Sequence, residues 1–172
     1  MKLVESIADI PNGDLQDLYR RWTALPRGTG GSVPAKKAAD AAFLGVLAPY
    51  CKFSSLHPPF RIRYDVVGPA LQKLYDEPMA GQYLDVLFDP WIRKVVQETY
   101  KTAHDEALPV YERKGFSTAW KKIGYEYLIL PFTDEADGAI TAFVTCLFPL
   151  NKETVWFDDW KNAVDATPWL NG

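Results

Sequence analysis

Cysteines are scarce in this sequence of 172 residues, and long basic blocks and long apolar runs are missing from it. Lys and Arg number 19 against 22 Asp and Glu, and no long basic block offers the electrostatic footprint of a nucleic-acid-binding protein. No apolar run approaches the length that spans a bilayer. Glu5 and Asp9 stand where a signal peptide would need its apolar centre. We therefore expect a cytoplasmic protein that binds neither nucleic acid nor a membrane.

The chemistry-bearing residues do not form a recognisable catalytic or metal motif. The two cysteines, Cys51 and Cys146, are too few for a disulfide scaffold and are interpreted as reduced, buried side chains. His57 lies near Cys51, but the second half of a zinc-binding spacing is missing. His104 stands beside two acidic residues at the end of a predicted helix, which favours a solvated histidine. We predict no catalytic residue and no metal site, and we assign no cofactor.

The N-terminal part of the chain predicts two helices. Asp14 is a good N-cap, and an apolar stripe at helical spacing follows it and ends before Pro26. A stretch rich in glycine, residues 27–34, predicts a hinge. Pro34 then suits the first position of a second helix, which Pro49 would end.

The middle of the chain predicts two strands, residues 50–56 and 60–67, separated by His-Pro-Pro. In the second strand the alternation of side chains places Phe60, Ile62, Tyr64 and Val66 on one face. Gly68 ends this strand, and a short helix over residues 69–75 follows.

The C-terminal half predicts one long helix and three further strands. The helix begins at Asp89-Pro90, an N-cap followed by a proline. The strands are expected at 107–115, 119–131 and 139–149, and the acidic loop 133–138 joins the last two as a hairpin. The last strand is apolar on both faces, so we expect it to be central in the sheet. This order of elements predicts an α+β domain with an antiparallel sheet.

The order and three segments resemble a PAS domain of the bacterial single-domain type. The segment RYDVVG (63–68) resembles the second strand entering the first short helix of that family. MAGQYLDVLF (79–88) resembles the segment before the long helix, and YEYLILPFTDEADGAITAFV (125–144) resembles the fourth and fifth strands with their loop. The resemblance covers residues 36–150. It leaves residues 1–35 as an N-terminal helix with its hinge and residues 151–172 as an aromatic C-terminal tail.

The resemblance implies a five-stranded antiparallel sheet flanked by helices, with a cavity for a small molecule or a signal. PAS domains generally sense or dimerise and do not catalyse. On this framework, the spacing of the apolar residues and the positions of the aromatic residues predict which side chains bind the ligand. These residues are Tyr64, Val66, Ile92, Val95, Val96, Thr99, Tyr111, Tyr125, Tyr127, Val144 and Phe148.

The resemblance also carries expectations about partners. Because the chain has no room for an output domain, we expect a signalling partner protein or a change in self-association. We predict a homodimer through the first helix and the outer face of the last strand, formed by Leu18, Tyr19, Trp22, Phe143 and Leu147. The tail, with Trp156 and Trp160, either covers its own sheet or docks a partner.

Two other functions stay open at this point. One is a small α+β cone enzyme of the isomerase or dehydratase kind, which would need a buried acid or histidine with a tuned pKa facing tyrosine hydroxyls. The predicted inward stripes contain tyrosines but no acid. The other is a structural interaction module whose own side chains fill the core.

Overall fold

The computed structural model describes residues 1–27, 31, 33–73, 78–88, 90–117, 122–134 and 138–150. The expected C-terminal tail, half of the glycine-rich hinge and the Asp89 cap lie outside these residues. Within them, each predicted strand is present, with boundaries that differ from the predicted ones by no more than three residues.

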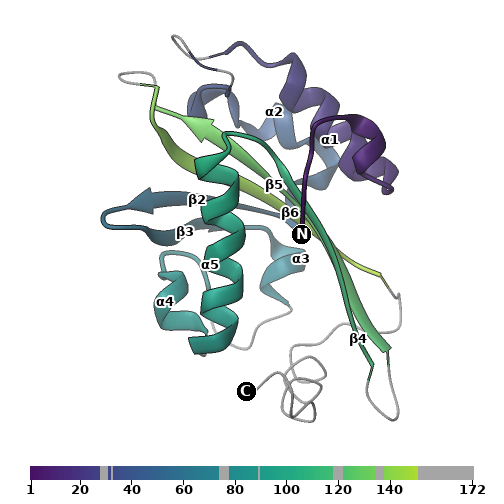
Figure 1. Cartoon of the computed structure of the whole chain (residues 1–172), viewed down its shortest axis with the longest axis vertical. Coiled ribbons are helices and arrows are strands. Elements are labelled where there is room, and N and C mark those ends of the chain that lie inside the picture. The colour runs from purple at the N-terminus through teal and green to yellow at the C-terminus, as the bar shows by residue number, and fades with distance from the viewer. Residues whose placement is uncertain are drawn as a thin grey trace.

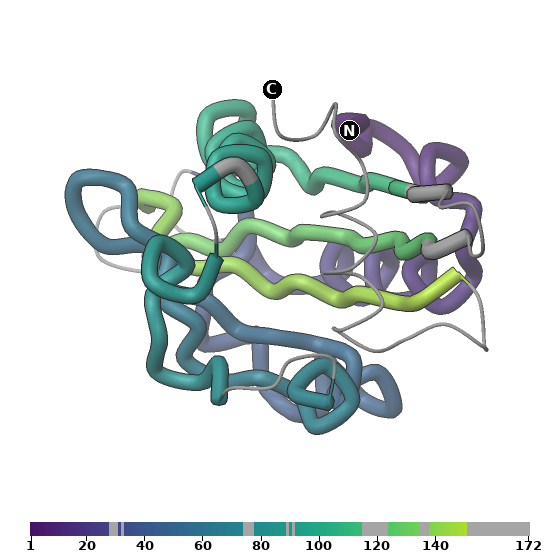
Figure 2. The backbone as a smooth tube through the Cα atoms, turned by 90° about the horizontal axis from the view of Figure 1, so that it is seen from below, coloured from purple at the N-terminus to yellow at the C-terminus, as the bar shows by residue number. Residues whose placement is uncertain are grey.

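The described residues form a six-stranded sheet in which every pair of neighbouring strands is antiparallel. Its spatial order is β1-β4-β5-β6-β2-β3, and Figure 2 shows β4, β5 and β6 running side by side. The five expected strands are joined by a short additional one, β1, which pairs with β4. The bounds are β1 Lys2–Leu3, β2 Cys51–His57, β3 Arg61–Val67, β4 Val110–Ser117, β5 Lys122–Thr133 and β6 Ile140–Pro149.

Helices cover both faces of this sheet (Figure 1). One face, called the outer face here, packs against α1 (Gly13–Ala24) and α2 (Ala41–Leu44). The other, the inner face, packs against α5 (Pro90–Asp105) and α4 (Leu84–Leu87), whereas α3 (Pro69–Gln72) lies against the 3-10 helix Gly45–Tyr50. The predicted α+β architecture, an antiparallel sheet flanked by helices, is therefore confirmed.

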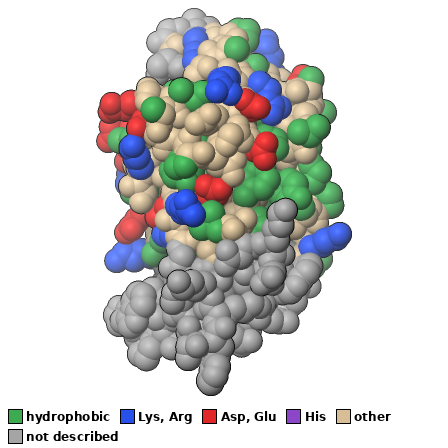
Figure 3. All heavy atoms as spheres, turned by 90° about the vertical axis from the view of Figure 1, so that its right-hand side faces the viewer, with side chains coloured by type: hydrophobic (Ala, Val, Ile, Leu, Met, Phe, Trp, Pro, Cys, Tyr) green, Lys and Arg blue, Asp and Glu red, His purple; other side chains and the backbone are tan. Residues whose placement is uncertain are grey.

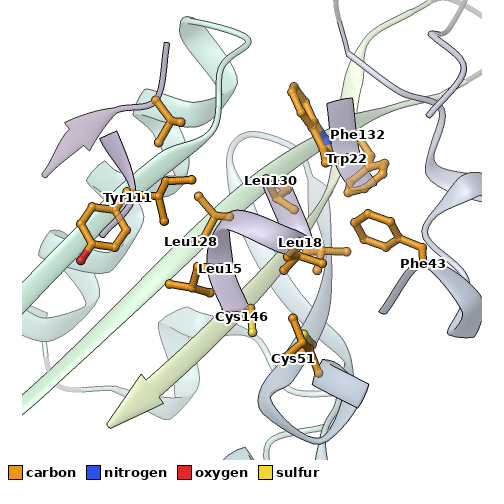
Figure 4. Close-up of a cluster of buried hydrophobic side chains, with 14 of the residues drawn as sticks. Leu15, Leu18, Trp22, Phe43, Cys51, Tyr111, Leu128, Leu130, Phe132 and Cys146 are labelled. Carbon is orange, nitrogen blue, oxygen red and sulfur yellow. The ribbon is translucent and has the colours of Figure 1, made fainter. Parts of the chain in front are cut away.

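The outer core lies between α1 and the middle strands (Figure 4). Leu15 and Leu18 of α1 are fully buried against Leu128 and Leu130 of β5. The indole of Trp22 is also buried, and its Nε1 donates a hydrogen bond of 3.0 Å to a backbone carbonyl of β5. A buried indole N–H needs such a partner, so this bond fixes the angle of α1 on the sheet.

The two N-terminal helices differ in detail from the prediction. The N-cap of α1 is Asn12, not Asp14: its side chain accepts from the backbone N–H groups of residues 14 and 15 at 2.9 and 3.2 Å. The predicted second helix is broken into the 3-10 turn Lys36–Ala38, α2 and the 3-10 helix Gly45–Tyr50. Asp40 caps α2 anew, and Gly45 has a φ of 54°, so the helix cannot run through it.

The two faces of β6 are assigned the wrong way round in the sequence prediction. Phe143 and Leu147 pack on the inner face against α5, whereas Val144 and Phe148 belong to the outer face under the N-terminal helices. Both stripes of β6 are apolar, so alternation separates them without showing which helix each one meets.

A β-bulge in β3 causes a second error. Phe53 of β2 pairs with Val66, but the next residue, Ser54, pairs with Tyr64, so Asp65 is the extra residue. The bulge reverses the alternation: Tyr64 points to the inner face, whereas Val66 points away from it and is 62% exposed.

Candidate functional site

The inner face brings together about half of the predicted ligand-binding residues. Six of the eleven lie between the sheet and α5: Tyr64, Ile92, Val96, Thr99, Tyr125 and Tyr127. The other five do not, namely Val66, Val95, Tyr111, Val144 and Phe148. Val95 is 37% exposed because the inward stripe of α5 continues through Tyr100 and Ala103 instead. Whether the six inward residues contact a ligand stays a prediction.

Tyr111 belongs to the outer face, opposite to its predicted place. Its hydroxyl donates a hydrogen bond of 2.8 Å to Glu126, which also accepts from Asn12 at 2.5 Å. Burial and the neighbouring Glu126 carboxylate raise the pKa of Tyr111 to about 12. This group ties the start of α1 to β5 and lies away from the inner face.

Three hydroxyl groups form a buried chain on the inner face. The Tyr100 hydroxyl of α5 lies 3.0 Å from Thr145 Oγ1 on β6 and 3.5 Å from Ser54 Oγ on β2. All three residues are almost fully buried. The ring of Tyr100 also packs edge-on against Phe143, with 5.1 Å between the ring centroids. Tyr100 therefore joins α5 to the two strands at the centre of the inner face.

Lys52 is the most unusual residue of this region. It lies directly opposite Thr145 in the strand pairing and is only 8% exposed. Its Nζ lies 4.1 Å from the centroid of the Tyr64 ring and 5.9 Å from that of Tyr100. No hydrogen bond or ion pair joins this ammonium to another side chain in the part of the chain that the structure describes.

The side chain of Lys52 is mostly removed from water, while its Nζ keeps some contact with solvent. A cation–π contact contributes about 0.5–2 kcal/mol, depending on how far the cation is desolvated. The two tyrosine rings therefore offset part of the cost of burying this side chain, and an anion that reached Nζ would add to this stabilisation.

A second polar group lies on the inner face, on the strands β4 and β5. The Tyr127 hydroxyl donates to Glu112 on β4 and lies 3.3 Å from the Thr99 hydroxyl of α5. Glu112 is 6% exposed and also contacts Lys114 at 3.1 Å and the N-terminal ammonium at 3.3 Å. Glu112 is the inward acid that the sequence analysis did not find.

The electrostatics of Glu112 show what this acid can do. Burial disfavours its charged form, but the Tyr127 hydroxyl and the two cations outweigh burial, and the pKa of Glu112 lies below its usual range. Burial and the Glu112 carboxylate raise the pKa of Tyr127. A general base that works near neutral pH needs the opposite shift of its carboxyl group. This pair therefore suits a structural ion pair better than the catalytic acid that a cone enzyme would need.

A pocket of about 290 Å³ lies at one end of β2 and β3, beside the 3-10 helix Gly45–Tyr50. Its apolar walls include the outer-face side chains Phe53, Val66 and Val144. Lys52 borders it as well. Val67, which packs against the inner core, lines the pocket too, so the pocket reaches the inner face at this end of the two strands.

The residues predicted to form a dimer interface are mostly buried within the chain. Leu18 and Phe143 are fully buried and Trp22 is 4% exposed, whereas Tyr19 and Leu147 are half-buried. The helix α1 covers the outer face of its own sheet, and Phe143 packs under α5. The predicted surface is therefore wrong as a single patch, since its members lie on opposite faces of the sheet.

Metal and membrane features are missing from the described ranges. No group of three or more His, Cys, Asp or Glu residues there is placed to hold a metal ion. Nor is any helix in those ranges long and apolar enough to cross a bilayer. On the face that Figure 3 shows, acidic and basic side chains are interspersed.

Sequence reasoning missed Lys52, Ser54, Thr145 and Glu112 on the inner face. It placed Tyr100 among the aromatic residues around the cavity but left it out of the predicted ligand-binding set. One signal was available for Tyr100: it stands at the i, i+4, i+8 spacing from Ile92 and Val96, the apolar stripe of α5. The others are polar residues within strands, whose burial depends on which helix covers the strand.

Of the comparisons with known proteins, the one with solved structures is the one that finds similar chains. No family model matches the sequence, and no curated protein does. The PAS domain of Bordetella pertussis BvgS is 14% identical, with a TM-score of 0.47, over 72% of this chain and 93% of that one. A PAS domain from Colwellia psychrerythraea is 10% identical, with a TM-score of 0.42, over 60% and 89%. A C-terminal domain from Streptococcus mutans is 10% identical, with a TM-score of 0.43, over 76% and 95%.

Proposed function

We propose that this protein is a PAS-type sensory or regulatory domain that binds a small molecule between α5 and the inner face of the sheet. The observation that carries the proposal is the contrast between the two cores. The outer core is built mainly from apolar side chains, whereas the inner one holds the hydroxyls of Ser54, Tyr100 and Thr145 together with Lys52. Buried polar groups that converge among aromatic rings are typical of sites that orient a small ligand.

The signal would pass from the ligand to a partner protein through α5. Tyr100 and Thr99 of α5 bond to hydroxyls of β6 and β5, so a ligand that replaces these contacts would change how the helix sits on the sheet. A partner protein, or a second copy of the chain, would read that change. Homodimer formation stays a prediction, and sedimentation of the purified protein with and without ligand would check it.

The test is native mass spectrometry of the freshly purified protein, followed by denaturation and an absorbance spectrum of what is released. We expect a defined added mass that Tyr100→Phe reduces, because this change removes the central hydroxyl and keeps the ring. Tyr111→Phe is the matched control on the outer face and should keep the added mass. If the purified protein carries no added mass and added metabolites leave its thermal midpoint unchanged, the proposal is wrong.

A further inference from the structure

We propose that Lys52 binds a carboxylate group of the ligand, so that the site selects small organic acids over neutral compounds of the same shape. This inference rests on the proposed function, because it places the ligand at the same inner face. It adds the chemical class of the ligand and the residue that recognises it.

The first argument is the position of the charge. The Lys52 residue is more than nine-tenths buried, and its ammonium, which keeps some contact with solvent, lies 4.1 Å from the ring centroid of Tyr64 on β3 and 5.9 Å from that of Tyr100 on α5. No acidic side chain pairs with this ammonium among the described residues. Buried charges in proteins are paired or coordinated, and an anionic ligand would complete the pair.

The second argument is the number of hydrogen-bond donors beside Lys52. Ser54, Tyr100 and Thr145 each carry one hydroxyl proton. Their two mutual contacts, of 3.5 and 3.0 Å, use no more than two of these three protons. One hydroxyl donor is therefore left over on the same face as the ammonium, and a carboxylate has two oxygen atoms to accept from both.

The third argument concerns the charge of the ligand. One cation with neutral hydroxyl donors matches a single negative charge. Phosphate groups carry more charge and are usually held by arginine clusters or several backbone N–H groups. A carboxylate is therefore the anion that these residues fit, and the rings of Tyr64 and Phe143 favour an acid with a short apolar body.

The experiment compares propionate with propionamide, which have nearly the same shape and differ in charge. Each compound is titrated into the ¹⁵N-labelled full chain, and the amide shifts of β2 and β6 give the dissociation constant. We expect propionate to bind the wild-type protein at least tenfold more tightly than propionamide does, since bonds to a charged group are the stronger ones.

The variants are Lys52→Met and, as a matched control, Lys101→Met. Both remove one positive charge, but Lys101 is exposed on α5 and pairs with Asp105. Lys52→Met should weaken propionate binding by about ten- to a hundredfold and leave propionamide binding unchanged. Lys101→Met should leave both unchanged.

The outcomes separate this inference from the proposed function. If propionate and propionamide bind the wild-type protein equally, or if Lys52→Met keeps its affinity for propionate, Lys52 is not a carboxylate-binding residue. Binding of a small molecule to the inner face would still stand. If neither compound binds and the purified protein releases a neutral ligand, the carboxylate inference alone is wrong. If it releases none and added metabolites also leave its thermal midpoint unchanged, both are wrong. The comparison of the two compounds needs no variant, so it holds even if Lys52→Met does not fold.

Discussion

Replacing Gly68 with alanine tests how the end of β3 is joined to the rest of the fold. A Cβ atom at this position would lie 2.4 Å from the carbonyl oxygens of Ala48 and Pro49 and 2.6 Å from the Pro49 carbonyl carbon. An ordinary carbon–oxygen contact is about 3.3 Å, so the two backbone segments would have to separate by about 0.9 Å. Backbone atoms cannot rotate out of the way as a side chain would.

The expected loss follows from the contacts at this point. Gly68 has a φ of −63°, which alanine adopts readily, so the effect is steric. Overpacking of a close contact costs about 1–3 kcal/mol. The separation would also weaken the hydrogen bond of 2.8 Å from the Gly68 N–H to the Cys51 carbonyl, worth about 0.5–1.5 kcal/mol. We expect Gly68→Ala to lower the free energy of unfolding by about 2–4 kcal/mol.

The assay is urea unfolding followed by circular dichroism, with Gly13→Ala as the matched control. Nothing lies within 4 Å of a Cβ atom at Gly13, the first residue of α1. This second change should be neutral or stabilising by up to about 1 kcal/mol, because alanine loses less backbone entropy in a helix. If Gly68→Ala unfolds within about 0.5 kcal/mol of the wild-type protein, the close approach of the two segments is wrong.

Three further predictions concern other buried groups. Because the pKa of Glu112 is lowered in the folded state, its contribution to stability is complete above about pH 4.3 and is lost as the pH falls through the lower folded-state value. Glu112→Gln should therefore flatten the fall in stability below that pH in urea titrations; an unchanged acid profile would contradict the lowered pKa. Trp22→Phe leaves a buried carbonyl of β5 without its donor and should cost about 1–3 kcal/mol in urea unfolding; an unchanged midpoint would contradict the role of this bond. Cys51 and Cys146 face each other in the strand pairing and are buried, and contact with Cys51 together with burial raises the pKa of Cys146. Iodoacetamide should alkylate neither thiol in the native protein and both in urea, and a rapid native adduct seen by mass spectrometry would refute their burial.

The amphipathic patterns of this sequence are sufficient to predict its longer helices and strands and their order, but not the short elements β1 and α4. Strict alternation over residues 60–67, the helical stripe from Ile92 to Ala103 and the acidic loop after β5 are local signals, because each depends on the backbone of one segment. They predict an α+β domain with an antiparallel sheet, and the structure confirms it. The broken second helix is the local exception, since Asp40 and Gly45 interrupt it between apolar residues that fit a helical stripe.

The composition of the candidate site depends on tertiary structure. Alternation shows that Phe143 and Val144 point to opposite faces of β6, but both are apolar, so the sequence leaves open which of them meets α5. Val66 is turned outward by one extra residue in β3, which only the pairing with β2 reveals.

Lys52 shows most clearly that the tertiary structure, and not the local sequence, decides which residues form the candidate site. In the sequence it is one charged residue in a strand, and charged residues are mostly exposed. Its side chain becomes mostly buried because β3 supplies Tyr64 and α5 supplies Tyr100, which stands 48 positions after Lys52 in the chain. Local sequence therefore determined the strands and helices, whereas the packing of distant segments decided which polar groups meet, because burial depends on what covers a strand.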